Sequence, residues 1–90
     1  MNLRDTIAAV STPPGRGGIG IVRISGADAT AVAAAILRLP ERFTWRAWQV
    51  SLADLLDAEG HIIDHVVVTY YAAPKSYTAE DVVEIGRAHV

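Results

Sequence analysis

The stretch T-P-P-G-R-G-G-I-G-I-V-R-I-S-G, residues Thr12–Gly26, joins a Pro-Pro corner, four glycines within six residues and a run rich in β-branched side chains. Pro13 and Pro14 each restrict φ and lack a backbone donor, while the glycines permit left-handed or crowded backbone that a side chain would forbid. A loop of this kind lets the main chain approach a ligand or a partner closely. The alternative is a tight surface turn before a strand, and these residues alone leave both open.

The spacing Gly15-x-Gly17-x-x-Gly20 also satisfies the dinucleotide-binding fingerprint. That motif needs a strand before the glycines and a helix that opens within them. Here the glycines lead into residues 19–24, which have strand composition, so no helix N-terminus is expected to hold a phosphate. The phosphate-loop pattern G-x-x-x-x-G-K-[ST] is absent, because the only lysine is Lys75. We do not expect this segment to bind a nucleotide.

The bulk properties narrow the class of protein. A chain of 90 residues fits one small domain and buries about 60–65% of its unfolded surface. The absence of cysteine excludes disulfides and thiolate metal sites and is compatible with a reducing cytoplasm. A net charge of −2 predicts no strong attraction to nucleic acid or anionic membrane, and no apolar run approaches the roughly 18 residues that span a bilayer. With no targeting pattern at the start, we expect a soluble, cytoplasmic protein.

The pattern of apolar residues predicts the elements. A helix is expected over residues 28–38, stopped by Pro40, and strands over residues 6–10, 18–25, 43–52, 61–72 and 78–85. Alternation in the second of these strands places Val22 and Ile24 on one face and Ile21, Arg23 and Ser25 on the other. From the residues alone, Arg23 is either a functional cation or an arginine whose stem lies along a strand edge.

Two tryptophans, Trp45 and Trp48, lie in the expected strand 43–52. We predict that they anchor the core or an interface, because no basic patch surrounds them as a base-stacking platform would require. Residues 57–60 have the composition of a hairpin turn. His61 and His65 have a spacing found in metal sites, but in a strand they lie about 13 Å apart, so no metal site is expected.

The last predicted strand has a competing interpretation. Residues 73–77 are expected to form a loop, and Thr78-x-x-Asp81 then matches a helix capping box. The valine and isoleucine content of residues 78–85 favours a strand instead. In that strand Glu80, Val82 and Glu84 would share a face.

The stretch Thr12–Gly26, D-T-I-A-A before it, I-D in the long strand, and A-P-K-S-Y-T-A-E-D-V-V-E-I near the end occur in that order. Together they resemble the N-terminal domain of the tRNA-modification GTPase family MnmE/TrmE, from about Asp5 to Ile85. The resemblance assigns residues 1–85 to a tetrahydrofolate-binding and dimerisation domain that is incomplete at its C-terminus.

The resemblance implies an α+β fold, with a mixed or antiparallel sheet and a flanking helix, similar to the folate-binding aminomethyltransferase domains. It implies binding of 5-formyltetrahydrofolate or a related one-carbon tetrahydrofolate, and a constitutive homodimer. In the family, a separate domain binds GTP with K+ and Mg2+. The full protein works with an FAD-containing partner (MnmG/GidA) to modify carbon 5 of the wobble uridine in tRNA. The chain alone is expected neither to hydrolyse GTP nor to modify tRNA.

Two residues match the family's folate contacts: Arg23 in V-R-I-S-G and Glu80 in Y-T-A-E-D. By this resemblance, the Glu80 carboxylate accepts the adjacent N–H and amine of the pterin. Arg23, permanently charged, donates to oxygens or carboxylates of the cofactor. The alternative for each residue is a structural salt bridge, within the domain or at the dimer contact. No catalytic residue and no metal ligand is predicted.

Two positions depart from the family pattern. Ala79 stands where the family usually has glycine in Y-T-G-E-D, and if φ is positive there, alanine costs about 1 kcal/mol and tilts Glu80. The tail G-R-A-H-V, residues 86–90, replaces the family's histidine-glycine-glycine turn and helix. We interpret this tail as an artefact of a gene cut short during assembly.

Two other functions stay open. One is a self-sufficient folate-dependent aminomethyltransferase, although the sequence offers no clear acid–base constellation for it. The other is a purely structural dimerisation module without a cofactor.

Overall fold

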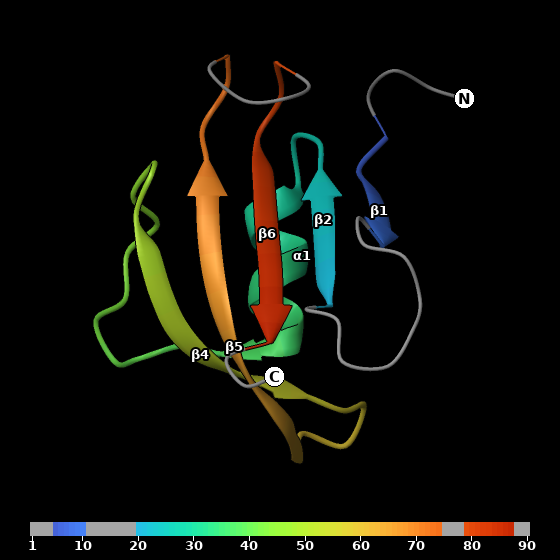
Figure 1. Ribbon diagram of the computed structural model, residues 1–90, viewed down its shortest axis with the longest axis vertical. Helices are drawn as coiled ribbons and strands as arrows, with labels where there is room; N and C mark the ends of the chain where they lie inside the picture. Colours follow the sequence, from blue (N-terminus) through green and yellow to red (C-terminus); the bar gives the residue numbers. More distant parts are fainter. Residues whose placement is uncertain (1–4, 11–19, 75–78, 88–90) are drawn as a thin grey trace.

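The computed structural model describes residues 5–10, 20–74 and 79–87 of the chain. These residues form one antiparallel sheet and one helix (Figure 1). The elements in chain order are β1 Ile7–Val10, β2 Ile21–Ser25, α1 Ala29–Ile36, β3 Leu37–Arg38, β4 Val50–Leu56, β5 Ile62–Tyr71 and β6 Val82–Arg87. The expected α+β class, with a flanking helix, is therefore confirmed.

The sheet order is β1-β2-β6-β5-β4-β3, and every neighbouring pair is antiparallel. The last strand of the chain, β6, thus lies between β2 and β5 at the centre of the sheet (Figure 1). Its Val82 and Val83 are 1% and 0% exposed although they face opposite sides of the sheet. The centre of the fold is therefore completed only when the C-terminal segment pairs on both of its edges.

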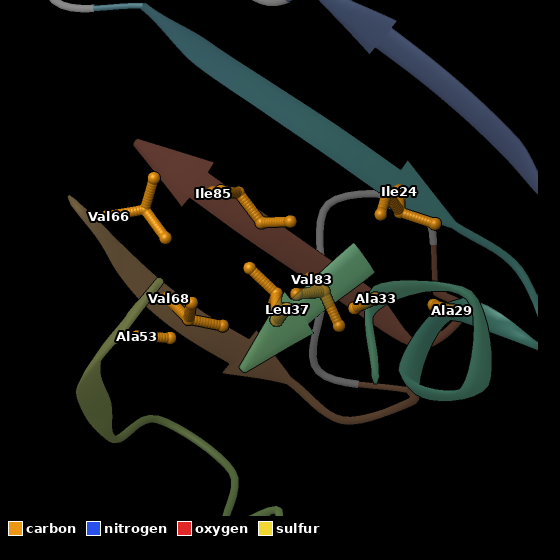
Figure 2. Close-up of a cluster of buried hydrophobic side chains, with 9 residues drawn as sticks. All are labelled: Ile24, Ala29, Ala33, Leu37, Ala53, Val66, Val68, Val83 and Ile85. Carbon is orange, nitrogen blue, oxygen red and sulfur yellow. The ribbon is translucent and has the colours of Figure 1, made fainter. Parts of the chain in front are cut away.

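The core lies between the sheet and α1, which contacts β2, β3 and β6. Every second residue of β2, β5 and β6 points to this side, as the two-residue period of a strand requires. Small residues on the helix let its backbone approach the sheet closely. Figure 2 shows the buried cluster of Ile24, Ala29, Ala33, Leu37, Ala53, Val66, Val68, Val83 and Ile85. Full burial of one valine, leucine or isoleucine side chain of this cluster contributes about 1.5–3 kcal/mol.

The helix is shorter than the predicted 28–38, because α1 ends at Ile36 and the chain turns extended at Leu37. Pro40 prevents the helix from continuing through it, because its ring would clash with the carbonyl of Ile36, but the end at Ile36 itself coincides with the pairing of the next residue to β4. Leu37 instead pairs with Leu55 of β4 and is 5% exposed. The helix therefore ends before Pro40, as predicted, but two residues earlier than the predicted end at Arg38.

The predicted strand 43–52 was wrong over most of its length, since β4 begins only at Val50. Arg42 and Trp48 have φ of 65° and 64°, which interrupts extended backbone. The aromatic rings there pack edge-to-face: Phe43 on Trp45 at 4.9 Å, Trp45 on Tyr70 at 5.8 Å, and Trp48 on Tyr71 at 4.9 Å between centroids. Trp45 packs against the core, as predicted, whereas Trp48 is 60% exposed.

The other described elements agree with the predictions in kind, although the last strand covers Val82–Arg87 rather than residues 78–85, so that Glu80 lies before the strand and not within it. Residues 7–10 and 62–71 are strands, and residues 82–87 form a strand rather than the alternative helix. In the turn between β4 and β5, Oδ1 of Asp57 accepts the main-chain N–H groups of Glu59 and His61 at 2.9 and 2.8 Å. Most of the glycine-rich loop and of the 73–77 loop lies outside the described residues.

Candidate functional site

The candidate site lies on the face of the sheet opposite α1, which we call the open face. Arg23 and Ser25 of β2 point to it because Ile24 between them points into the core. Strand pairing places Arg23 directly opposite Glu84 of β6. The Nε of Arg23 donates to Oε1 of Glu84 at 2.9 Å, and the two side chains are 38% and 15% exposed. A cross-strand ion pair thus occupies the middle of this face.

A second contact joins the same two segments. The hydroxyl of Ser25 donates to Oε2 of Glu80 at 3.2 Å, and Ser25 is 7% exposed. Glu80 precedes β6, but the pairing of the two segments continues through the N–H of Gly26, which donates to the carbonyl of Asp81 at 2.9 Å. The side chain of Glu80 therefore reaches the open face, beside that of Arg23.

The structure brings the two sequence-predicted residues, Arg23 and Glu80, to neighbouring positions. Arg23 and Ser25 are two residues apart on β2, a repeat of about 6.6 Å along a strand, and Glu80 is bonded to Ser25. Arg23 also makes the salt bridge that the sequence left open as an alternative, and its partner is Glu84. The sequence analysis placed Glu84 on the face of Glu80 but did not identify it as the partner of Arg23.

Ala79, immediately before Glu80, has a φ of 60°. This is the left-handed region, in which a residue with a Cβ is disfavoured by roughly 1–2 kcal/mol. From the sequence, alanine is expected to be costly at this position if φ is positive, and φ is positive here. The strained residue lies beside one of the two proposed cofactor contacts.

Neither Arg23 nor Glu80 lines either of the following two hollows, both of which are formed by described residues. The smaller, about 190 Å³, opens beside Glu84 and is otherwise lined by Ile21, Val67, Thr69, Gly86 and Arg87. The larger, about 570 Å³, lies at β3, β4 and β5 and is lined by Arg38, Leu39, Pro40, Leu52, Ala53, Asp54, His65 and Val66. Although larger, the second hollow belongs to a different part of the sheet from Arg23 and Glu80.

The open face also carries exposed apolar side chains toward its two edges. Ile7 of β1, opposite Ser25, is 47% exposed, and Val50 and Leu52 of β4 are 66% and 69% exposed. The strand register aligns Val50, Thr69, Glu84 and Arg23 in one row across the sheet. Exposed apolar side chains gathered on one face often mark a surface that contacts a partner or a ligand.

His61 and His65, the histidines within the described residues, each pair with a different carboxylate. Nδ1 of His65 lies 2.7 Å from Oδ1 of Asp54, and Nδ1 of His61 lies 3.4 Å from Oδ2 of Asp57. Asp57, Glu59 and His61 offer three ligand atoms within 4.8 Å of one another. This group lies in a turn, where Asp57 already accepts two main-chain N–H groups. The turn therefore accounts for the short distances between these three side chains.

The pKa of the Tyr70 phenol is raised above its ordinary value of 10.0 by burial, and further by the charge of Asp81 and a hydrogen bond to it. Oδ1 of Asp81 also accepts the N–H of Ala73 at 2.9 Å. Asp81 therefore joins the end of β5 to the start of β6, next to Glu80. Among the described residues, α1 is far too short to cross a membrane.

Comparison with known proteins gives a consistent result. Residues 6–89 match the family described as GTP-binding protein TrmE N-terminus. The chain is 52% identical over 87 residues to the tRNA modification GTPase MnmE of Koribacter versatilis, a match over 94% of this chain and 19% of that protein. It is 48% identical over 86 residues to MnmE of Nitrosomonas eutropha, and 47% over 83 residues to MnmE of Chloroflexus aurantiacus. These two matches cover 94% and 92% of this chain and 18% of each relative. The chain thus spans about a fifth of the curated relatives it matches.

Proposed function

The chain belongs to the family of TrmE N-terminal domains, and from that premise we propose that it is the part of a tRNA-modification GTPase that binds a one-carbon tetrahydrofolate and pairs with a second copy. The observation that carries the proposal is the arrangement on the open face. There Arg23 pairs with Glu84 at 2.9 Å, and Ser25, two residues further along β2, donates to Glu80 at 3.2 Å, so two side chains of opposite charge, Arg23 and Glu80, lie on the same face.

The chemistry of these two side chains fits a reduced folate. A carboxylate accepts two adjacent N–H groups in a paired geometry, which is what the pterin edge presents to Glu80. A guanidinium carries five N–H donors, so the ion pair of Arg23 with Glu84 is compatible with donation to a folate oxygen or carboxylate. When bound, the folate supplies a one-carbon unit, and these residues only hold and orient it.

We further propose that the fold is that of the folate-binding aminomethyltransferase domains. In the whole protein, GTP with K+ and Mg2+ would bind a separate domain. An FAD-containing partner of the MnmG/GidA type would join it in modifying the wobble uridine of tRNA. The chain alone is proposed to be inactive as an enzyme and to be located in the cytoplasm.

Calorimetry with 5-formyltetrahydrofolate tests the cofactor assignment. Weak binding by the chain is expected, and Glu80→Gln should abolish it because an amide cannot accept two N–H groups as a carboxylate does. Glu59→Gln makes the same change in the exposed β4–β5 turn and should leave binding unchanged. Equal affinity of the Glu80 variant and the unchanged chain would contradict the assignment.

A second function, a dimerisation module without a cofactor, is favoured by one observation. Arg23 is already paired with Glu84, and the exposed Val50 and Leu52 on the same face, on β4 two strands away from β6, suit a contact between copies. A dimer in sedimentation velocity that shows no response to folate would support this function over the first. Transfer of an aminomethyl group by the chain alone would instead support an independent enzyme.

We also propose the division of the chain into a domain over residues 1–85 and a foreign tail over residues 86–90. Gly86 and Arg87, at the end of β6, pair with Ile21 of β2 and Val66 of β5. Backbone pairing of this kind does not require particular side chains, so it is compatible with residues of foreign origin. Sequencing the gene across the codon of Glu84 tests the division. A genuine stop after Val90 would refute it.

A further inference from the structure

We propose that Glu84 and Ser25 are positioning residues of the tetrahydrofolate site: Glu84 orients the guanidinium of Arg23, and Ser25 orients the carboxylate of Glu80. This inference rests on the function proposed above. It adds to Arg23 and Glu80 a second pair of residues, which bind no ligand themselves but decide where the two charges point.

The first half of the proposal concerns Glu84, which is well placed to fix an arginine. Its strand, β6, is bonded to β2 on one side and to β5 on the other, so its backbone has little freedom. Its carboxylate is only 15% exposed and accepts from Nε of Arg23 at 2.9 Å. Pairing at Nε sets the plane of the guanidinium, and with it the direction of the terminal nitrogens.

The second half concerns Ser25. Among the described residues, Ser25 is the polar residue that is buried. Glu80 lies outside the regular part of β6, directly after Ala79 with its φ of 60°. The sheet pairing therefore does not fix Glu80 as firmly as it fixes Glu84. The hydroxyl of Ser25, held in β2, donates to Oε2 of Glu80 at 3.2 Å and so orients a carboxylate on a less constrained backbone.

The two contacts act together because β2 supplies one member of each. Arg23 and Ser25 alternate with Ile24, whose burial in the core at 2% exposed prevents the strand from rotating or shifting by one residue. A ligand that meets side chains already held in place avoids the entropy of ordering them, about 0.5–1.5 kcal/mol for each side chain. Loss of either contact should therefore weaken binding about 2- to 10-fold without removing a ligand contact.

The test compares the affinity for 5-formyltetrahydrofolate of the unchanged chain with that of Ser25→Ala, Glu84→Ala, Glu84→Gln and Glu80→Gln. The first two should bind about 2- to 10-fold more weakly, and Glu84→Gln less so, because its amide oxygen still accepts from Nε of Arg23. Asp64→Asn is the matched control: Arg87 and Asp64 form an ion pair of the same length, 2.9 Å, away from Arg23 and Glu80. Its affinity should not change.

A ligand-free NMR measurement separates positioning from a general structural effect. The side-chain Nε–H signal of Arg23 should shift in Glu84→Ala but not in Ser25→Ala, and the carboxyl carbon signal of Glu80 should shift in Ser25→Ala but not in Glu84→Ala. If folate binds and Glu80→Gln abolishes binding while Ser25→Ala and Glu84→Ala bind normally, the positioning proposal alone is overturned. If the unchanged chain shows no binding at all, the proposed function fails and the positioning role fails with it.

Discussion

The guanidinium of Arg23 on β2 and the carboxylate of Glu84 on β6 meet at 2.9 Å, although 61 positions separate them in the sequence. Their strands are adjacent only because the end of the chain pairs between β2 and β5. The contact therefore forms only when β6 has paired with β2, so it depends on the assembly of the whole sheet as well as belonging to the candidate site.

Removal of this ion pair should cost little stability. Arg23 is 38% exposed, so solvent screens the pair, and exposed pairs of this kind contribute about 0–1 kcal/mol. We expect Glu84→Ala to lower the free energy of unfolding in urea by about 1 kcal/mol and Glu84→Gln by less. Asp64→Asn should have a similarly small effect. A loss of several kcal/mol would mean that Glu84 supports the fold itself, which would weaken its assignment as a positioning residue.

Replacement of Ala79 by glycine should stabilise the protein. The left-handed backbone at φ 60° costs alanine roughly 1–2 kcal/mol, and glycine removes this cost. Part of the gain is offset because glycine makes the unfolded chain more flexible. The net expectation is a rise of about 0.5–1 kcal/mol in the free energy of unfolding by urea. Ala31→Gly is the same substitution on the exposed face of α1 and should lower stability by about 1 kcal/mol. If both variants lose stability, the positive φ at residue 79 is refuted.

Gly26 should tolerate alanine far less well than Gly60. A Cβ at Gly26 would meet the Thr6 Cα at 2.6 Å, and the φ there is 141°, whereas at Gly60, with φ 87°, a Cβ meets nothing within 4 Å. Gly60→Ala thus carries only backbone strain, about 1 kcal/mol. Gly26→Ala adds a steric clash with Thr6, the residue just before β1. We expect Gly26→Ala to cost about 2–3 kcal/mol, measured by thermal unfolding. Equal losses would contradict the close packing of Thr6 on Gly26.

A charge on the open face should weaken self-association. Leu52 is 69% exposed on this face, and Val32 is 41% exposed on α1, so each can be replaced without opening the core. We expect Leu52→Glu to shift the chain toward monomer in sedimentation velocity, because a charge would be buried at the contact. Val32→Glu should leave the distribution unchanged. The reverse result would place the dimer contact on the helical side.

The stability of the protein should fall at alkaline pH through Tyr70. Because burial and Asp81 raise the pKa of its phenol above 10.0 in the folded state, the unfolded chain loses this proton first as the pH rises. The contribution of the protonated phenol is therefore complete below about pH 10 and is lost progressively above it, up to the folded-state pKa. Urea unfolding at increasing pH should show this loss, and Tyr70→Phe should remove it. The phenolate absorbance of the unchanged chain, compared with that of Tyr70→Phe, should show the late titration as the component that the substitution removes.

The local elements that the sequence predicted correctly are those with a strong period. Alternation in residues 21–25 placed Ile24 and Arg23 on opposite faces, and the structure shows that the face of Ile24 is the core. Asp57 and Gly60 predicted the turn between β4 and β5. The two main errors have non-local causes. Leu37 leaves the helix to pair with β4, and aromatic rings from residues 43–48 pack on β5 instead of continuing a strand.

The sequence by itself determined which residues favour strand, helix or turn, and which face of each strand is apolar, because those properties depend on neighbours within a few positions. The tertiary structure alone decided that β6 lies between β2 and β5, and so that Arg23 meets Glu84 and Ser25 meets Glu80 across 61 and 55 positions. The physical reason is that antiparallel edges present similar rows of N–H and C=O groups to any partner. Which edges pair, and in what register, is settled only when the whole core is buried on one side of the sheet.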